Sequence, residues 1–265
     1  APNHMFFNGV MAVEQGRFEF VKRYKDKLNE ISELYESEYC WGLRWILGAR
    51  LMLKSRNLPE ALKDAETGIA LANRRNQLLD AVMLHGLKAY IQVLQGDSAG
   101  AEKSLQEAEE IYSQEKQVVP WYCHTYRLGR FFFDIYNLEK NIYSNNQAGI
   151  REFGNKAKQS GKTALKIAAR CAIIQTDSFR LMGLYCWLTG NQKKALSWWD
   201  KSIKTGERLN ARPDLARTYV EIGKRLSEEK SKETDLNGIG PQEYFKKARA
   251  IFEEMKLESD LHELD

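Results

Sequence analysis

Proline is scarce in this sequence, which has only five prolines in 265 residues. Because proline removes a backbone donor and clashes inside a helix, its scarcity favours long helices. Long hydrophobic runs are also lacking: no stretch reaches the roughly 18 apolar residues of a membrane-spanning helix, so no span is predicted. The first ten residues lack the basic and then apolar pattern of a secretory signal. The sequence does not begin with methionine, and we expect it to be part of a longer protein.

Cysteine is present without any Cys-x-x-Cys spacing, which disfavours a metal or redox motif. The four cysteines each lie in an apolar setting: Cys40, Cys123, Cys171 and Cys186. We therefore expect buried free thiols and a cytoplasmic location.

Charge of one sign and catalytic signatures are missing as well. The 40 Lys and Arg residues nearly balance the 36 Asp and Glu residues, and a net charge of +4 is too small to indicate a nucleic-acid partner by itself. No nucleophile motif or carboxylate pair suited to acid–base chemistry occurs. No two of the four histidines have the spacing of metal ligands on a helix. We therefore expect no enzyme activity, no cofactor and no metal.

What the sequence does contain is a helix–turn–helix pattern, clearest in GLYCWLTGNQKKALSWWDKSI. Apolar residues at steps of three and four, which are typical of a helix, precede Gly190. Gly190 is predicted to end this helix in a left-handed conformation, and Asn191 to cap the next one. In the second helix we expect at least one of Trp198 and Trp199 to be buried.

The same order of residues recurs along the chain. A small residue is followed by a turn pair seven and eight residues later and by an alanine twelve residues later. Three copies follow this order: Ala49 with Arg56-Asn57 and Ala61, Ala89 with Gly96-Asp97 and Ala101, and Gly183 with Gly190-Asn191 and Ala195. Weaker copies contain Gly9 and Gly223, the latter with an insertion, residues 227–240, where the turn is expected.

This pattern resembles the tetratricopeptide-repeat family, whose helix pairs carry small residues and a Gly-Asp or Gly-Asn turn at these places. The resemblance covers the whole chain. It implies an all-α fold in which antiparallel helix pairs form a right-handed superhelix, as a single domain over residues 1–265. The repeat is longer than usual, since Ala61 and Ala101 lie 40 residues apart. The last 60 or so residues are similar to the closing repeats of large bacterial signalling ATPases and adenylate/guanylate cyclases, which implies a module of a larger signalling protein.

The middle of the chain departs most from the repeat. We expect one long helix from Pro120 to about Ser144, and a second from about Gln147 to Ala172 that is interrupted at Ser160-Gly161. The first carries a dense set of aromatic residues: Trp121, Tyr122, Tyr126, Phe131, Phe132, Phe133 and Tyr136. Most should lie in the core, but consecutive phenylalanines cannot all face inward on one helix. An aromatic-lined pocket around Trp121–Tyr136 would make the protein a sensor of a small molecule or lipid.

The second of these helices carries a basic stripe. Its members are spaced four apart and follow one helical ridge: Lys158, Lys162, Lys166 and Arg170. No acidic residue lies between Glu152 and Asp177. The stripe has three interpretations: a solvated helix face, a docking site for an acidic partner, or a site for RNA or DNA. The lack of interleaved aromatic residues disfavours nucleic acid.

The family resemblance also implies a binding groove, because the first helices of its repeats line the concave surface. Its exposed positions, carried over to this sequence, give seven candidates: Arg50, Tyr90, Tyr126, Arg130, Arg180, Trp187 and Lys224. Arginine and aromatic residues are favoured at binding hot spots, and guanidinium groups bind carboxylates in a bidentate manner. The function expected is therefore a non-catalytic protein-interaction module for a protein or acidic peptide. The alternative is that these arginines pair with acids of neighbouring repeats.

Overall fold

The computed structural model describes residues 2–265, and within them it contains thirteen α-helices, one short 3₁₀ turn and no β-strand. The all-α class predicted from the sequence is therefore confirmed. The chain divides into two compact units, Ala1–Phe133 and Asp134–Asp265. The boundary falls within α7 (Pro120–Tyr143), the long helix expected after Pro120.

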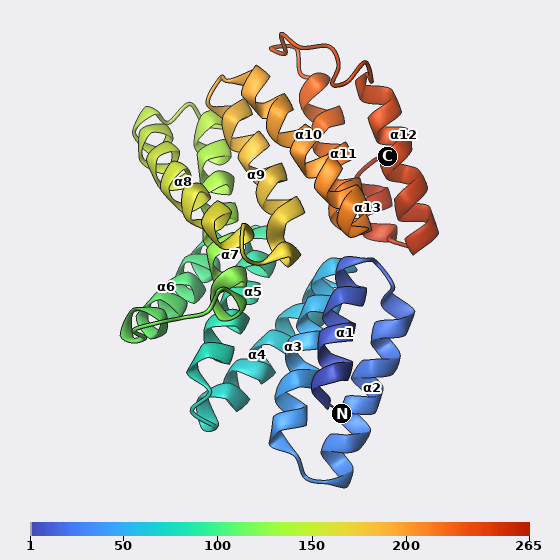
Figure 1. Cartoon of the computed structure of the whole chain (residues 1–265). Helices are drawn as coiled ribbons and strands as arrows, with labels where there is room; N and C mark the ends of the chain where they lie inside the picture. Colours follow the sequence, from blue (N-terminus) through green and yellow to red (C-terminus); the bar gives the residue numbers. More distant parts are fainter. Residues whose placement is uncertain (1) are drawn as a thin grey trace. The chain divides into compact units, whose positions relative to one another are not determined.

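The first unit is built of three helix pairs and the first half of α7. The paired helices are α1 (Pro2–Glu14) with α2 (Phe18–Leu34), α3 (Glu38–Lys54) with α4 (Leu58–Arg74), and α5 (Leu78–Leu94) with α6 (Ser98–Gln114). Successive helices lie side by side and run in opposite directions (Figure 1). Short turns with left-handed residues join the partners of each pair, at Gly16, Arg56 and Gly96.

The second unit is also built of successive helices, and two of its connections are longer, residues 169–174 and 227–240. After α7 come α8 (Gln147–Ala168), a 3₁₀ turn (Ala172–Ile174), α9 (Gln175–Leu188), α10 (Gln192–Leu209), α11 (Arg212–Leu226), α12 (Pro241–Met255) and α13 (Glu258–His262). The turn predicted between α9 and α10 is confirmed. Gly190 has a φ of 82°, and the Asn191 side chain accepts a hydrogen bond from the Lys194 amide at 3.3 Å.

The helix after Asn146 differs from the sequence-based expectation in two ways. It is not interrupted at Ser160-Gly161, and it ends at Ala168 rather than Ala172. Ser160 lies within the helix, and its hydroxyl donates to the Lys156 carbonyl one turn back, at 3.0 Å, so its polar group is satisfied without leaving the helical backbone. Gly161 is buried on the packed side of the helix, so its lack of a side chain serves close packing rather than a break.

Small residues let the helices approach closely where the repeat pattern places them. A Cβ atom on Gly183 in α9 would lie 2.3 Å from Nε1 of Trp199 in α10. Trp199 is fully buried and donates from Nε1 to the Arg180 carbonyl at 3.1 Å, which confirms the expectation of a buried tryptophan in this pair. The small residue and the indole therefore fit together as one packing unit.

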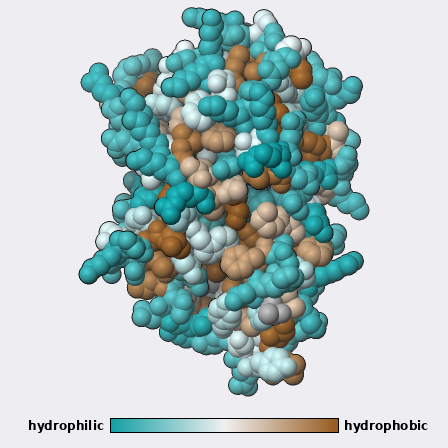
Figure 2. Space-filling view, viewed as in Figure 1, coloured by the Kyte–Doolittle hydropathy of each residue, from teal (hydrophilic) through white to brown (hydrophobic). Residues whose placement is uncertain are grey.

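The surface is mostly hydrophilic, and apolar side chains appear in patches on the face shown in Figure 2. All four cysteines are free and buried, as expected. Within residues 2–265, none of the helices combines the length and the apolar character needed to cross a bilayer.

Candidate functional site

The seven groove candidates fall on helices of both units, but most of them are not accessible. Arg50, Tyr90, Tyr126 and Arg130 belong to the first unit, and Arg180, Trp187 and Lys224 to the second. Five are buried: Arg50, Tyr90, Tyr126, Arg180 and Trp187. The exposure expected for these five is wrong, because side chains of neighbouring helices cover them. Arg130 is half-buried and Lys224 is exposed.

In the first unit, Arg50 of α3 joins a buried polar cluster. Its Nη1 atom lies 3.7 Å from Oε1 of Glu14 in α1, whose other oxygen pairs with Lys54 at 2.9 Å. Its Nη2 atom donates to Nε2 of His124 in α7, and the guanidinium lies 5.7 Å from the ring of Trp121. Arg50 therefore links α1, α3 and α7 instead of facing a partner.

His124 fits this cluster as a neutral ring. Its Nδ1 atom donates to the Trp121 carbonyl, which leaves Nε2 as the acceptor for Arg50. The side chain is fully buried, and burial together with the Arg50 charge holds the pKa of His124 well below its ordinary value. A proton on His124 would remove the acceptor and place two cations side by side.

This cluster predicts that acidification destabilises the first unit. The unfolded chain takes up a proton on His124 near pH 6.5 and the folded chain does not, so stability is full above pH 6.5 and falls below it. Each such histidine contributes a slope of at most about 1.4 kcal/mol per pH unit. We expect the free energy of unfolding, measured by urea denaturation at pH 7.5 and 5.5, to depend less on pH in His124→Gln than in the wild type. Equal pH dependence in both would contradict this account, and His262→Gln at an exposed position serves as the control.

The aromatic residues of α7 make packing contacts in the first unit. Phe132 stacks on Tyr90 of α5 at a centroid distance of 4.4 Å, and Tyr126 lies 5.9 Å from Tyr112 of α6. Trp121 contacts Phe6 and Phe7 of α1 at 6.0 and 5.2 Å. These rings hold α7 against its neighbours in the unit. Of the seven aromatic residues expected mostly in the core, three are buried (Tyr126, Phe131 and Phe133) and the other four are half-buried.

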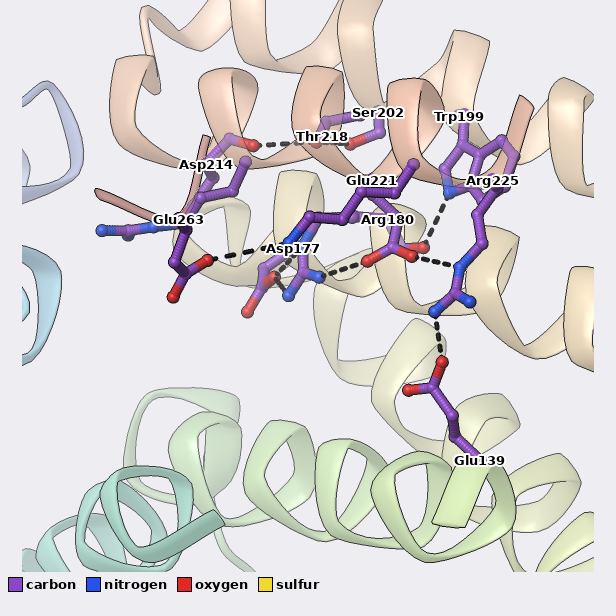
Figure 3. A network of polar contacts seen from close by, with 12 residues as sticks. Glu139, Asp177, Arg180, Trp199, Ser202, Asp214, Thr218, Glu221, Arg225 and Glu263 are labelled. Carbon is purple, nitrogen blue, oxygen red and sulfur yellow. Dashed lines mark hydrogen bonds and ion pairs between the residues drawn. The ribbon is translucent and has the colours of Figure 1, made fainter. Parts of the chain in front are cut away.

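In the second unit, Arg180 of α9 lies between two carboxylates. Its Nε atom donates to Oδ1 of Asp177 at 2.8 Å, and its Nη1 atom lies 3.5 Å from Oε2 of Glu221 in α11 (Figure 3). Arg180 and Asp177 are both buried. The pairing of Arg50 with Glu14 and of Arg180 with Glu221 agrees with the alternative interpretation of these arginines, in which they bind acids of neighbouring repeats.

Arg225 of α11 is the centre of the same network. It donates to Glu221 at 2.7 Å and to Glu139 of α7, which lies 86 positions earlier in the chain (Figure 3). It also donates to Glu228 at 2.6 Å. Burial alone would lower the pKa of Arg225, but Glu221 and Glu139 outweigh it and raise the pKa. Trp187 donates from Nε1 to Glu228 at 2.9 Å, so this groove candidate also serves the network.

Sequence reasoning missed Arg225 and its carboxylates. The spacing of Glu221, Arg225 and Glu228 at steps of four and three is a sign of ion pairs on a helix, which was available in the sequence. Glu139 has no such local signal. In the part of the chain that the structure describes, no three His, Cys, Asp or Glu side chains are placed to hold a metal ion.

The basic stripe lies on α8 and the residues that follow it. Lys158, Lys162, Lys166 and Arg170 are all exposed, and Arg151 lies exposed on the same side of the helix. Within residues 2–265 none of these five cations has an ion pair, whereas Lys156 on the other side pairs with Glu152 at 2.6 Å. The opposite face of α8 is buried through small residues such as Ala157, Gly161 and Ala164, so the cations lie on the side that faces solvent.

Lys224, the remaining exposed candidate, lines a groove between α11 and α12 with a volume of about 400 Å³. The groove also contains Phe245, Lys246 and Arg249 of α12, and Glu263 from the last residues of the chain. It is therefore a second accessible surface with an excess of positive charge in this unit.

No protein-family model matches the chain, and no curated protein is significantly similar to it. The resemblance to tetratricopeptide repeats stays a prediction.

Proposed function

We propose that this protein is a non-catalytic interaction module, part of a larger cytoplasmic signalling protein, and that it binds an acidic segment of a partner protein through the basic stripe of α8. The observation that supports this proposal is the row of exposed cations without ion pairs on α8. By contrast, Arg50 and Arg180 of the expected groove pair with carboxylates of the chain itself. Unpaired charges of one sign steer a partner of the opposite sign and fix its register.

The spacing of the stripe suits an acidic helix. Cations four residues apart repeat about every 6 Å along a helix, because each residue advances about 1.5 Å. A partner helix with glutamates four apart repeats at the same distance and can place a carboxylate opposite each cation. A helix that lies along the stripe binds the exposed surface of α8 and needs no pocket. The opposite face of α8 is already packed through small residues.

The test uses a labelled synthetic peptide of about 16 residues with glutamate at every fourth position, and measures its affinity by fluorescence anisotropy. The triple variant Lys158→Gln, Lys162→Gln, Lys166→Gln should bind it about tenfold more weakly, since each exposed pair contributes roughly 0.2–1 kcal/mol. The affinity for the peptide should also fall as the salt concentration is raised from about 50 to about 300 mM, because the shorter Debye length screens the exposed charge pairs.

The matched control removes three exposed lysines that also lack an ion pair, in the variant Lys103→Gln, Lys116→Gln, Lys193→Gln. Both triple variants change the net charge equally. The proposal is wrong if the two bind the peptide with the same affinity. It is also wrong if a single-stranded RNA of similar length binds the stripe more tightly than the peptide does.

A further inference from the structure

The groove between α11 and α12 is partly filled by the last residues of the chain itself. The segment Glu258–Asp265 folds back across these two helices and places Glu263 and Leu264 in the groove. It carries four carboxylates and no Lys or Arg: Glu258, Asp260, Glu263 and Asp265. An acidic segment of the chain therefore already lies on a basic surface.

The inner end of this segment is held firmly. Leu257 and Asp260 are buried, with exposed fractions of 2% and 3%. Arg217 of α11 donates from Nε and Nη2 to the two oxygens of Asp260, both at 2.8 Å. A buried bidentate pair of this kind fixes the position of the carboxylate and is costly to break.

The outer end is held weakly. Glu263 lies 3.9 Å from Lys224, and Asp265 accepts a hydrogen bond from Arg249 at 2.7 Å. The side chains of both pairs are between 41% and 63% exposed. The hydrogen bond from Arg249 lowers the pKa of Asp265, so this carboxylate stays charged. Exposed pairs contribute little because water and salt screen them, and the tip can therefore leave while Asp260 stays in place.

We infer that the groove of Lys224, Lys246 and Arg249 is a second binding site for an acidic peptide segment, and that Glu263 and Asp265 occupy it as an intramolecular competitor. The inference shares with the proposed function the kind of partner, but it concerns a different surface. Lys224 and Arg249 meet the two weakly paired carboxylates of the tip, and Lys246 lies 3.9 Å from Glu243 of its own helix in another exposed pair. Phe245 adds an apolar wall beside them, which suits a leucine next to the acids, as Leu264 is in the segment itself.

A competitor of this kind makes the site conditional. An acidic partner segment must displace Glu263 and Asp265 before it reaches Lys224 and Arg249. Its apparent affinity is therefore the intrinsic affinity multiplied by the fraction of molecules in which the tip has left the groove. Loss of charge at the tip opens the groove, while the anchor at Asp260 keeps the fold of α11 to α13.

The experiment uses a labelled synthetic peptide with the sequence of residues 258–265, added in trans. All proteins carry the triple substitution on α8, so that binding at the stripe is weakened and is the same in every protein compared. In this background, Glu263→Gln with Asp265→Asn should tighten peptide binding about fivefold, which corresponds to the loss of two exposed ion pairs. Adding Lys246→Gln and Arg249→Gln to these variants should remove the gain.

The matched control is Glu229→Gln with Glu258→Gln, which changes the net charge equally at two exposed carboxylates without an ion pair. Circular dichroism checks that each variant keeps its helices. The inference is overturned if the tip variant and this control bind the peptide alike, or if Lys246→Gln with Arg249→Gln leaves the gain unchanged. Because the α8 stripe carries the same three substitutions in all these proteins, either result leaves the proposed function untouched, and a failure of the stripe leaves this experiment unaffected.

Discussion

Replacement of Gly86 by alanine is expected to destabilise the first unit by about 3 kcal/mol or more, or to prevent its folding. A Cβ atom at this position would lie 2.2 Å from the backbone nitrogen of Tyr126 and 2.5 Å from its Cα atom. The clash is with the backbone of α7 and not with a movable side chain. Thr125, next to it, donates to the Met83 carbonyl at 2.6 Å, which ties the two helices together at the same place. The helices must therefore separate to accept a methyl group.

Urea denaturation followed by circular dichroism measures this effect, with Gly42→Ala as the control. The nearest atom to a Cβ on Gly42 is Nη1 of Arg75 at 3.4 Å, at the end of a flexible side chain. Alanine is the better helix former by about 0.5–1 kcal/mol, so the control should be neutral or slightly stabilising. Similar stabilities for the two variants would show that the contact between α5 and α7 is looser than described.

Replacement of Arg225 by methionine should destabilise the second unit by about 3–5 kcal/mol. The change removes the one cation shared by Glu139, Glu221 and Glu228 and leaves these carboxylates close together without it. Like charges in a partly buried place repel one another and raise each other's pKa, so the variant should regain stability as the pH falls toward 5. The wild type should show no such gain in this range from the network, because Arg225 pairs with all three carboxylates.

Two further variants separate the loss of the ion pairs from the loss of packing. Arg225→Met combined with Glu139→Gln and Glu221→Gln should recover more than half of the lost stability, since only the carboxylate of Glu228 is then left without Arg225. Arg249→Met removes an exposed pair and should cost less than about 1 kcal/mol. A triple variant no more stable than Arg225→Met would mean that Arg225 acts mainly through packing of its side chain.

Features that depend on neighbouring residues were predictable from the sequence. Gly190 and Asn191 form a turn because a left-handed glycine and an asparagine cap act within a few residues of the chain. The stripe of α8 was predictable for the same reason: a spacing of four places Lys158, Lys162 and Lys166 on one side of any helix. The interruption predicted at Ser160-Gly161 is wrong because both residues were taken as helix breakers. In the structure Ser160 makes a hydrogen bond within the helix, and Gly161 lies buried on the packed side of the helix.

The expected groove depended on residues far apart in the sequence. The side chains that reach an arginine from other helices decide whether it faces solvent. Arg50 meets Glu14 from α1 and His124 from α7, and Arg225 meets Glu139 from 86 positions earlier. No sequence pattern within one helix predicts such partners. Positions carried over from a family also assume that family's neighbours, and this chain places carboxylates where an open groove was expected.

The four hidden thiols have a practical consequence. Two of them, Cys40 and Cys123, lie in the first unit, and the other two, Cys171 and Cys186, lie in the second. Burial raises the pKa of Cys186, which further slows its reaction in the native state. A thiol reagent therefore reaches each cysteine only when the surrounding helices open. The rate at which a thiol reagent modifies the cysteines of each unit therefore reports how often that unit opens, and no cysteine has to be introduced.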